Sequence, residues 1–187
     1  MPQMLMIAAL LLFAVISCPA QTRESPSIAS CACSDWPNWE DRDGVTCHYL
    51  TVPEDHDNPD GTSIRIAFAI FRGTGQNTGN IPTVILTGGP GGRALGGIDW
   101  WFDDDLRALG DLIVVEQRGI GLSSPLPDVG QRTFEILAAD LTSEEEKAQT
   151  RALMQENARE IKAAGIDVTK YNSSQNARDF GVLMHTL

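Results

Sequence analysis

Two short apolar runs constrain the fold more than any other feature of this sequence. Residues 83–87 and 111–116 are almost continuously apolar, which is typical of strands buried on both faces, as in a parallel sheet covered by helices. Residues 98–109 lie between them with helical spacing, and their expected apolar face is Trp101, Leu106 and Leu109. The order strand, helix, strand predicts a right-handed crossover between two parallel strands.

An antiparallel hairpin is predicted before this unit. It pairs residues 48–52 with residues 63–72, and the segment between them is dense in turn-forming residues. The second run alternates apolar positions, as a half-buried strand does; these are Ile64, Ile66, Phe68 and Ile70. The predicted fold class is therefore α/β, with an antiparallel opening hairpin that leads into a parallel sheet with flanking helices.

Two helices are predicted in the second half of the chain. The first covers residues 143–164, with Ser143 and Glu146 as a capping box and Gly165 as its end. The second begins near Asn172 or Ser173, and its apolar face is predicted from the helical spacing. That face consists of Ala177, Phe180, Met184 and Leu187. It needs a further strand to pack on, so we expect the fold to be incomplete.

The N-terminus has the pattern of a processing signal. The apolar run at residues 4–16 is too short to span a membrane but has the length of a signal-peptide core. Cleavage after Ala20 is one interpretation, with residues 1–20 as the signal. Residues 15–18 also resemble a bacterial lipobox, which would lipidate Cys18 and anchor the protein to a membrane. Both alternatives predict export to the periplasm, the cell envelope or the extracellular space.

Export favours disulfides among the cysteines of the irregular Cys- and Trp-containing leader, residues 21–46, and the domain that follows it. Cys31 and Cys33 are too close in sequence to pair easily, so we expect Cys47 to pair with one of them and one thiol to remain. A zinc site that includes His48 is the competing interpretation, but the spacing fits no common zinc pattern. We therefore expect no metal.

The charge of the chain excludes one class of partner. A formal net charge of -11 and a pI near 4.6 leave no basic stripe that could release counterions from nucleic acid. The same charge gives anionic lipid headgroups nothing to attract. It is the charge of an ordinary soluble surface, and it is also compatible with a cationic substrate.

A glycine cluster follows the first apolar run. Residues 87–92 read T-G-G-P-G-G, and such loops let the backbone approach a ligand and present its amides to a phosphate or an oxyanion. A phosphate loop needs Lys followed by Ser or Thr, but Arg93 and Ala94 stand there, and the spacing of a dinucleotide loop also fails. A plain tight turn is the remaining alternative for a glycine cluster taken alone.

The second apolar run ends in E-Q-R-G-I-G-L-S, residues 116–123. With the glycine cluster, this segment resembles the α/β-hydrolases of the prolyl and tripeptidyl aminopeptidase group, in which a G-G-P-G loop follows one strand and D-Q-R-G-x-G-x-S follows the next. Residues 47–59 and 171–179 match the group in the same order. The resemblance covers residues 47–187 and identifies them as the N-terminal part of such a hydrolase domain. Thr87 stands where prolyl aminopeptidases have His, and Glu116 replaces their Asp.

The resemblance also implies a function. It predicts a serine hydrolase, most similar to a proline iminopeptidase, that releases N-terminal residues from peptides without a cofactor. The amide of Gly89 is the expected oxyanion-hole donor and Gly88 shapes the loop, while the second donor would come from the residue after the nucleophile. Arg118 is expected to pair with a carboxylate and to lock its loop.

The catalytic triad is missing from the sequence. No G-x-S-x-G occurs in the 187 residues, and residues 121–125 come closest without the final glycine, so Ser123 is interpreted as a turn-capping hydroxyl. His48, His56 and His185 do not fit the required order after a nucleophile. We therefore expect an N-terminal fragment that is inactive alone. The alternative is a non-catalytic envelope protein or lipoprotein that binds peptides or a partner. The sequence does not predict an oligomeric state.

Overall fold

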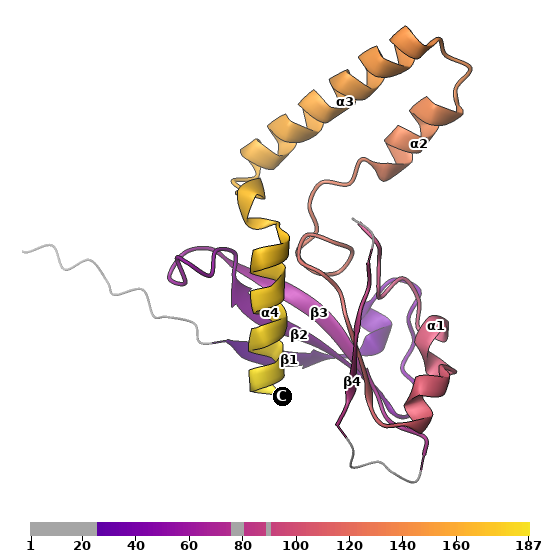
Figure 1. Cartoon of the computed structure of the whole chain (residues 1–187), viewed down its shortest axis with the longest axis vertical. Helices are drawn as coiled ribbons and strands as arrows, with labels where there is room; N and C mark the ends of the chain where they lie inside the picture. The colour runs from indigo at the N-terminus through magenta and orange to yellow at the C-terminus, as the bar shows by residue number, and fades with distance from the viewer. Residues whose placement is uncertain (1–25, 76–80, 89–90) are drawn as a thin grey trace, which may run out of the picture.

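The computed structural model describes residues 26–75, 81–88 and 91–187 (Figure 1). The predicted signal segment, Cys18 and Gly89 lie outside the described residues. The elements follow in the order β1 (Ser27–Cys31), η1 (Cys33–Asp35), β2 (Val45–Pro53), β3 (Ser63–Phe71), β4 (Thr83–Leu86), α1 (Asp99–Phe102), η2 (Asp105–Ala108), β5 (Leu112–Val115), α2 (Gly130–Ala138), α3 (Ser143–Ala163), η3 (Val168–Lys170) and α4 (Ser173–Thr186).

The sheet is mixed and mostly antiparallel, in the strand order β1-β2-β3-β5-β4. Three of its four pairings are antiparallel, and only β4 with β5 is parallel. The predicted fold class, the N-terminal portion of an α/β-hydrolase fold with a hairpin leading into a parallel sheet, is therefore wrong. The physical reason is that β5 pairs with β3 on its other side, in the antiparallel sense, so the hairpin forms the centre of the sheet.

The hairpin itself is confirmed and is longer than predicted. Its register runs from Val45 opposite Phe71 to Pro53 opposite Ser63. β3 is buried on both faces, whereas alternation alone predicted one buried face. One face of β3 contributes Ile64, Ile66 and Phe68 to one apolar cluster, and the other contributes Ala67, Ala69 and Phe71 to a second.

β1 was not predicted, because its residues belong to a leader without apolar periodicity. It pairs along its whole length with β2, from Ser27 opposite Thr51 to Cys31 opposite Cys47. Most of its side chains are exposed. Backbone hydrogen bonds to β2 hold this edge strand, and they leave no signature in the side-chain pattern.

Two apolar clusters cover the two faces of the sheet. On one face, Trp36 and Trp39 close over Phe71 and Leu112. On the other face, α4 lies across the strands (Figure 1) and inserts Leu183 between their side chains.

The predicted apolar face of α4 is right only at Phe180, which is partly buried against the sheet, and wrong at Ala177, Met184 and Leu187. The buried residues of this helix are Gln175, Asp179 and Leu183. Met184 and Leu187 are exposed instead. The helix is therefore rotated from the expected orientation, because polar contacts decide which side of its first half is buried.

The helix predicted over residues 143–164 is confirmed as α3. Its N-cap is Thr142, one residue earlier than predicted, and the capping box pairs Thr142 with Glu145. Gly165 follows the helix with a φ of 72°, a conformation that favours glycine and ends helices. α2 was not predicted; it lies beside α3, and the pair projects away from the sheet (Figure 1).

The single helix predicted over residues 98–109 forms as two short pieces, α1 and η2. Leu109, expected on the apolar face, is exposed, whereas Arg107 is buried. The guanidinium of Arg107 donates to the carbonyl oxygens of Arg72 and Phe102. These bonds compensate for the burial of the charged group. The side of the segment that faces the core therefore differs from the apolar face that the sequence spacing predicted.

The predicted disulfide of Cys47 is confirmed, with Cys33 as its partner and a Cα–Cα distance of 5.2 Å. Cys31 is the free thiol within the described ranges. The parts of the chain that the structure describes contain no cluster of residues able to hold a metal ion and no helix long and apolar enough to cross a membrane.

The buried centre of β3 makes a direct prediction about stability. Phe68 is 0% exposed and Phe134 of α2 is 67% exposed. We expect Phe68→Ala to lower the free energy of unfolding by about 3–5 kcal/mol, because it leaves a cavity in the core. Phe134→Ala, the matched control, is expected to change it by less than about 0.5 kcal/mol. Urea unfolding followed by circular dichroism measures both; similar effects of the two variants would contradict this packing.

Candidate functional site

The start of the glycine loop and the loop after β5 lie side by side. The parallel register places Leu86, the last residue of β4, opposite Val115, the last residue of β5. Because the carboxyl ends of parallel strands meet at one edge of a sheet, the segments that follow them also meet there. Gln117 donates a side-chain hydrogen bond to the carbonyl oxygen of Thr87. The start of the glycine loop is therefore bonded directly to the neighbouring loop.

The described flanks of the glycine loop are open. Gly88 is exposed, and a Cβ atom there would meet no other atom within 4 Å. The same is true of Gly91, whose φ of 85° favours glycine over residues with a side chain. Gly89 lies outside the described residues, so the role of its amide stays a prediction. On both sides of it, the chain leaves room for a ligand to approach the backbone.

Glu116 connects the far side of the glycine loop to the sheet. Its buried carboxylate accepts long hydrogen bonds from the amides of Leu95, at 3.4 Å, and Leu122, at 3.5 Å. A Cβ atom at Gly121 would lie 2.5 Å from Oε2 of Glu116, so only glycine allows the loop to turn around this carboxylate. Burial raises the pKa of Glu116 above its ordinary value.

Ser123 has a structural role, in agreement with its interpretation as a capping hydroxyl. Its Oγ donates to the carbonyl oxygen of Glu116, at 3.0 Å, and accepts from the amide of Ala67, at 2.8 Å. The residue is fully buried. The hydroxyl fastens the loop after β5 to β3 and is not presented to a substrate.

Arg118 is confirmed as the residue that locks this loop through a carboxylate. Its Nε and Nη2 atoms each donate to Asp179 of α4 at 2.7 Å, which is the bidentate arrangement. Both side chains are at most 2% exposed. The remaining donors reach the backbone carbonyl oxygens of Pro53, Glu54 and Lys170.

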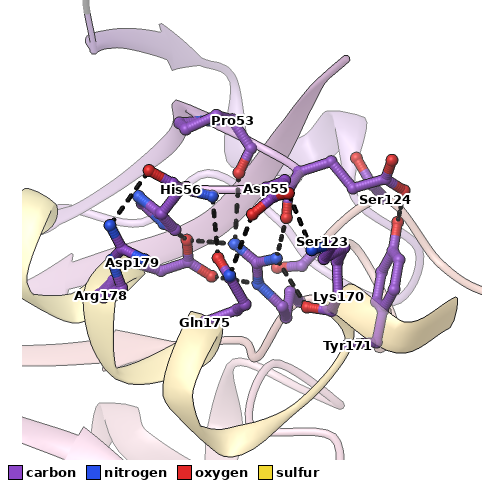
Figure 2. A network of polar contacts seen from close by, with 12 residues as sticks. Pro53, Asp55, His56, Ser123, Ser124, Lys170, Tyr171, Gln175, Arg178 and Asp179 are labelled. Carbon is purple, nitrogen blue, oxygen red and sulfur yellow. Dashed lines mark hydrogen bonds and ion pairs between the residues drawn. The ribbon is translucent and has the colours of Figure 1, made fainter. Parts of the chain in front are cut away.

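His56 completes the network on the other side of Asp179. Its Nε2 lies 2.7 Å from Oδ1 of Asp179, and its amide donates to the side chain of Gln175. This Asp–His pair resembles part of a triad in composition, but within the described residues no serine or cysteine hydroxyl or thiol is hydrogen-bonded to His56. The pair therefore fixes the connection between β2 and β3 on α4 (Figure 2).

Ion pairs at the rim extend the same attachment. Lys170 lies 2.8 Å from Asp55, and Arg178 lies 2.6 Å from Asp57. Gln175 also donates to Asp55 at 3.2 Å. The acidic turn after β2 is consequently occupied by contacts from η3 and α4.

A cavity of about 430 Å³ lies next to the glycine loop. Its walls come from that loop, the loop after β5 and the start of α4; they are formed by Gly91, Gln117, Arg118, Ile120, Leu126, Tyr171, Asn172, Ser173 and Asn176. Oδ1 of Asn176 is buried and has no hydrogen-bond partner. The same holds for Oγ1 of Thr87 at the start of the glycine loop. Both oxygens are therefore closed off by the surrounding protein atoms.

Comparison of the chain with protein-family models and with curated proteins finds no match.

The buried carboxyl of Glu116 predicts a pH-dependent stability. Its pKa in the folded state is raised from 4.5 because burial disfavours the charged form. A raised pKa stabilises the fold below about pH 4.5, and this contribution is lost as the pH rises through the folded-state pKa. We therefore expect the stability of the native protein, relative to Glu116→Gln, to fall between pH 4.5 and neutral pH.

Urea unfolding at a series of pH values measures this difference. Exposed Glu160 provides the control, since Glu160→Gln is expected to leave the pH profile parallel to that of the native protein. A native-minus-Glu116→Gln difference that stays constant or rises with pH would contradict the burial of the carboxyl.

The buried ion pair makes a further prediction. Arg118→Ala leaves the carboxylate of Asp179 buried without its main partner, and breaking such a pair costs about 3–5 kcal/mol of unfolding free energy. Arg132→Ala removes an exposed pair with Glu156 and is expected to cost less than about 1 kcal/mol. Guanidinium unfolding compares the two; a loss at Arg118 no larger than at Arg132 would show that the network is not formed.

Proposed function

We propose that this chain supplies the oxyanion-binding part of an exported serine hydrolase, most similar in function to an aminopeptidase. One observation carries the proposal. The glycine loop after β4 is open on its described flanks and is braced at its start by Gln117 of the adjacent loop. A loop held in this way keeps its backbone amides in place before a substrate arrives, which is the property that an oxyanion hole requires.

The proposed chemistry is acyl transfer. When a serine attacks a peptide carbonyl, the carbonyl oxygen becomes an oxyanion, and positioned amides stabilise this charge. In the proposal, the amide of Gly89 donates to that oxygen. Gly88 carries no side chain that could obstruct the approach.

The nucleophile belongs, in this proposal, outside the 187 residues. The chain contains no G-x-S-x-G, Ser123 is buried, and His56 is engaged by Asp179. The triad of these enzymes follows in the order serine, carboxylate, histidine. We propose that those three groups and the residue that supplies the second amide donor come from sequence that these residues do not contain.

The proposed substrate is the N-terminus of a peptide. The net charge of -11 favours a cationic group such as a terminal ammonium. The cavity beside the glycine loop is the proposed place for the N-terminal residue of that peptide, because its walls come from the loop and from the start of α4. Release of N-terminal residues as the specific reaction rests on the sequence resemblance.

A second candidate function is non-catalytic partner binding by an envelope protein or lipoprotein. Exposed apolar side chains on the projecting helices favour it, since soluble surfaces with large apolar groups are often interaction sites. These residues are Phe134, Leu137 and Met154. The two candidates differ in whether the native protein carries an activated serine.

The protein purified from its natural source distinguishes them. We expect an intact mass well above the 20.3 kDa of this chain and covalent labelling by a fluorophosphonate probe, which reacts with activated serines. A native product of no more than 20.3 kDa that resists the probe would overturn the hydrolase proposal and favour partner binding. The 187-residue chain alone is expected not to hydrolyse aminoacyl anilides.

The glycine loop is tested in the same native protein. Gly89→Pro removes the proposed donor amide, and we expect kcat to fall about 10²–10³-fold, as for loss of one oxyanion-hole donor. Gly97→Ala, outside the glycine loop, keeps every amide and adds a Cβ atom that meets no neighbour within 4 Å, so it is the control with a much smaller effect. Equal kcat values for Gly89→Pro and Gly97→Ala would contradict the assigned donor.

A further inference from the structure

We propose that Cys31, Cys33 and Cys47 form a disulfide site with two states, in which Cys31 can replace Cys33 as the partner of Cys47. In the structure Cys47 is bonded to Cys33 and Cys31 is a free thiol. The proposal concerns the face of the sheet opposite α4 and does not depend on the proposed hydrolase function.

The register of the sheet brings Cys31 to Cys47. The two residues are directly opposite each other in the antiparallel ladder of β1 and β2. Opposite residues in such a ladder have Cα atoms about 4.5–5.5 Å apart, and disulfides bridge Cα atoms about 4.4–6.8 Å apart. The existing bond between Cys33 and Cys47, with a Cα–Cα distance of 5.2 Å, lies in the same range. Both thiols are therefore within bonding reach of Cys47.

The side chains of Cys31 and Cys47 also share one face of the sheet. The preceding pair, Ser30 and His48, makes a side-chain contact at 3.2 Å, and successive side chains of a strand point to opposite faces. Cys31 accordingly packs against the apolar cluster that contains Cys33 and Cys47. The third sulfur therefore belongs to the same face of the sheet as the bond.

The exchange step is balanced within the chain. The thiolate of Cys31 attacks Sγ of Cys47, a new disulfide forms between them, and the bond from Cys47 to Cys33 breaks. Cys33 leaves as a thiolate and takes up a proton, which replaces the one that Cys31 released. One disulfide is present before and after the step, so neither an oxidant nor a reductant is consumed.

The exchange changes what holds Trp36 and Trp39, here called the tryptophan cover, against the sheet. Cys33 begins η1, and the chain after it carries Trp36 and Trp39 onto the sheet. Nε1 of Trp39 donates to the carbonyl oxygen of Leu95, which follows the glycine loop. With Cys31 bonded to Cys47, η1 loses its covalent attachment to β2. The support that Trp39 gives to Leu95 is then weakened.

The environment of Cys31 makes the exchange slow at neutral pH. Burial, followed by the negative charges of Asp35 and Asp41, raises the pKa of the Cys31 thiol above its ordinary value. The positive charge of Arg65 and the side chain of Trp36 act against this shift. The thiolate is the attacking species. At pH values below the pKa of the Cys31 thiol, the exchange rate is therefore expected to rise about tenfold with each unit by which the pH increases. The site therefore stays in the Cys33–Cys47 state unless alkali or a local positive charge produces the thiolate.

Acid-quenched thiol labelling tests the proposal on the full chain. The protein is held at neutral pH or at about pH 9.5, above the ordinary thiol pKa, then quenched in acid, labelled with N-ethylmaleimide and digested without reduction. We expect the label on Cys31 alone at first. Label on Cys33, together with a peptide that joins Cys31 to Cys47, is expected to appear with time and faster at the higher pH.

Two variants serve as matched controls. Cys33→Ser is expected to form the Cys31–Cys47 disulfide during oxidative folding. Cys31→Ser is expected to keep Cys33 unlabelled at every pH. The proposal is overturned if Cys33 of the native chain stays unlabelled at both pH values, or if only disulfide-linked dimers through Cys31 appear. The native-chain measurement decides the matter even if Cys33→Ser does not fold.

Discussion

The buried guanidinium of Arg118 is the constraint on which the arrangement of this domain depends. A charge removed from water must be neutralised and all its donors must be satisfied. Asp179 and three backbone carbonyl groups meet this demand, and they come from the end of β2, from η3 and from α4. One side chain thus fixes the loop after β5 to three segments that are far apart in sequence.

The position of the glycine loop follows from that attachment. The loop that carries Arg118 also carries Gln117, which bonds to Thr87 at the start of the glycine loop, and Glu116, which bonds to Leu95 beyond its end. The glycine loop has no large side chains of its own with which to hold a conformation. Its first residue, Thr87, is therefore held by a neighbouring loop that is itself locked to α4, and its described flanks are left open for a ligand.

Sequence reasoning succeeded where a local pattern determines the structure. It found the hairpin, the strands before both loops, α3, a disulfide of Cys47 and the pairing of Arg118 with a carboxylate, without identifying Cys33 or Asp179 as the partners. It failed where the outcome depends on distant partners. Apolar runs do not encode the direction in which β5 pairs, and no side-chain pattern marks β1. The orientation of α4 is set by polar contacts of Asp179 and Gln175 that helical apolar spacing does not reveal.

The two faces of the sheet are secured by different chemistry, and the segment around the glycine loop touches both. On the α4 face, the ion pair of Arg118 and Asp179 acts through Gln117 on Thr87. On the opposite face, the disulfide and the tryptophan cover act through Trp39 on Leu95. The ion pair is insensitive to thiol chemistry, whereas the cover depends on which cysteine is bonded to Cys47. In the proposed exchange, the segment around the glycine loop therefore loses support only at Leu95, while Gln117 of the loop after β5 continues to hold Thr87.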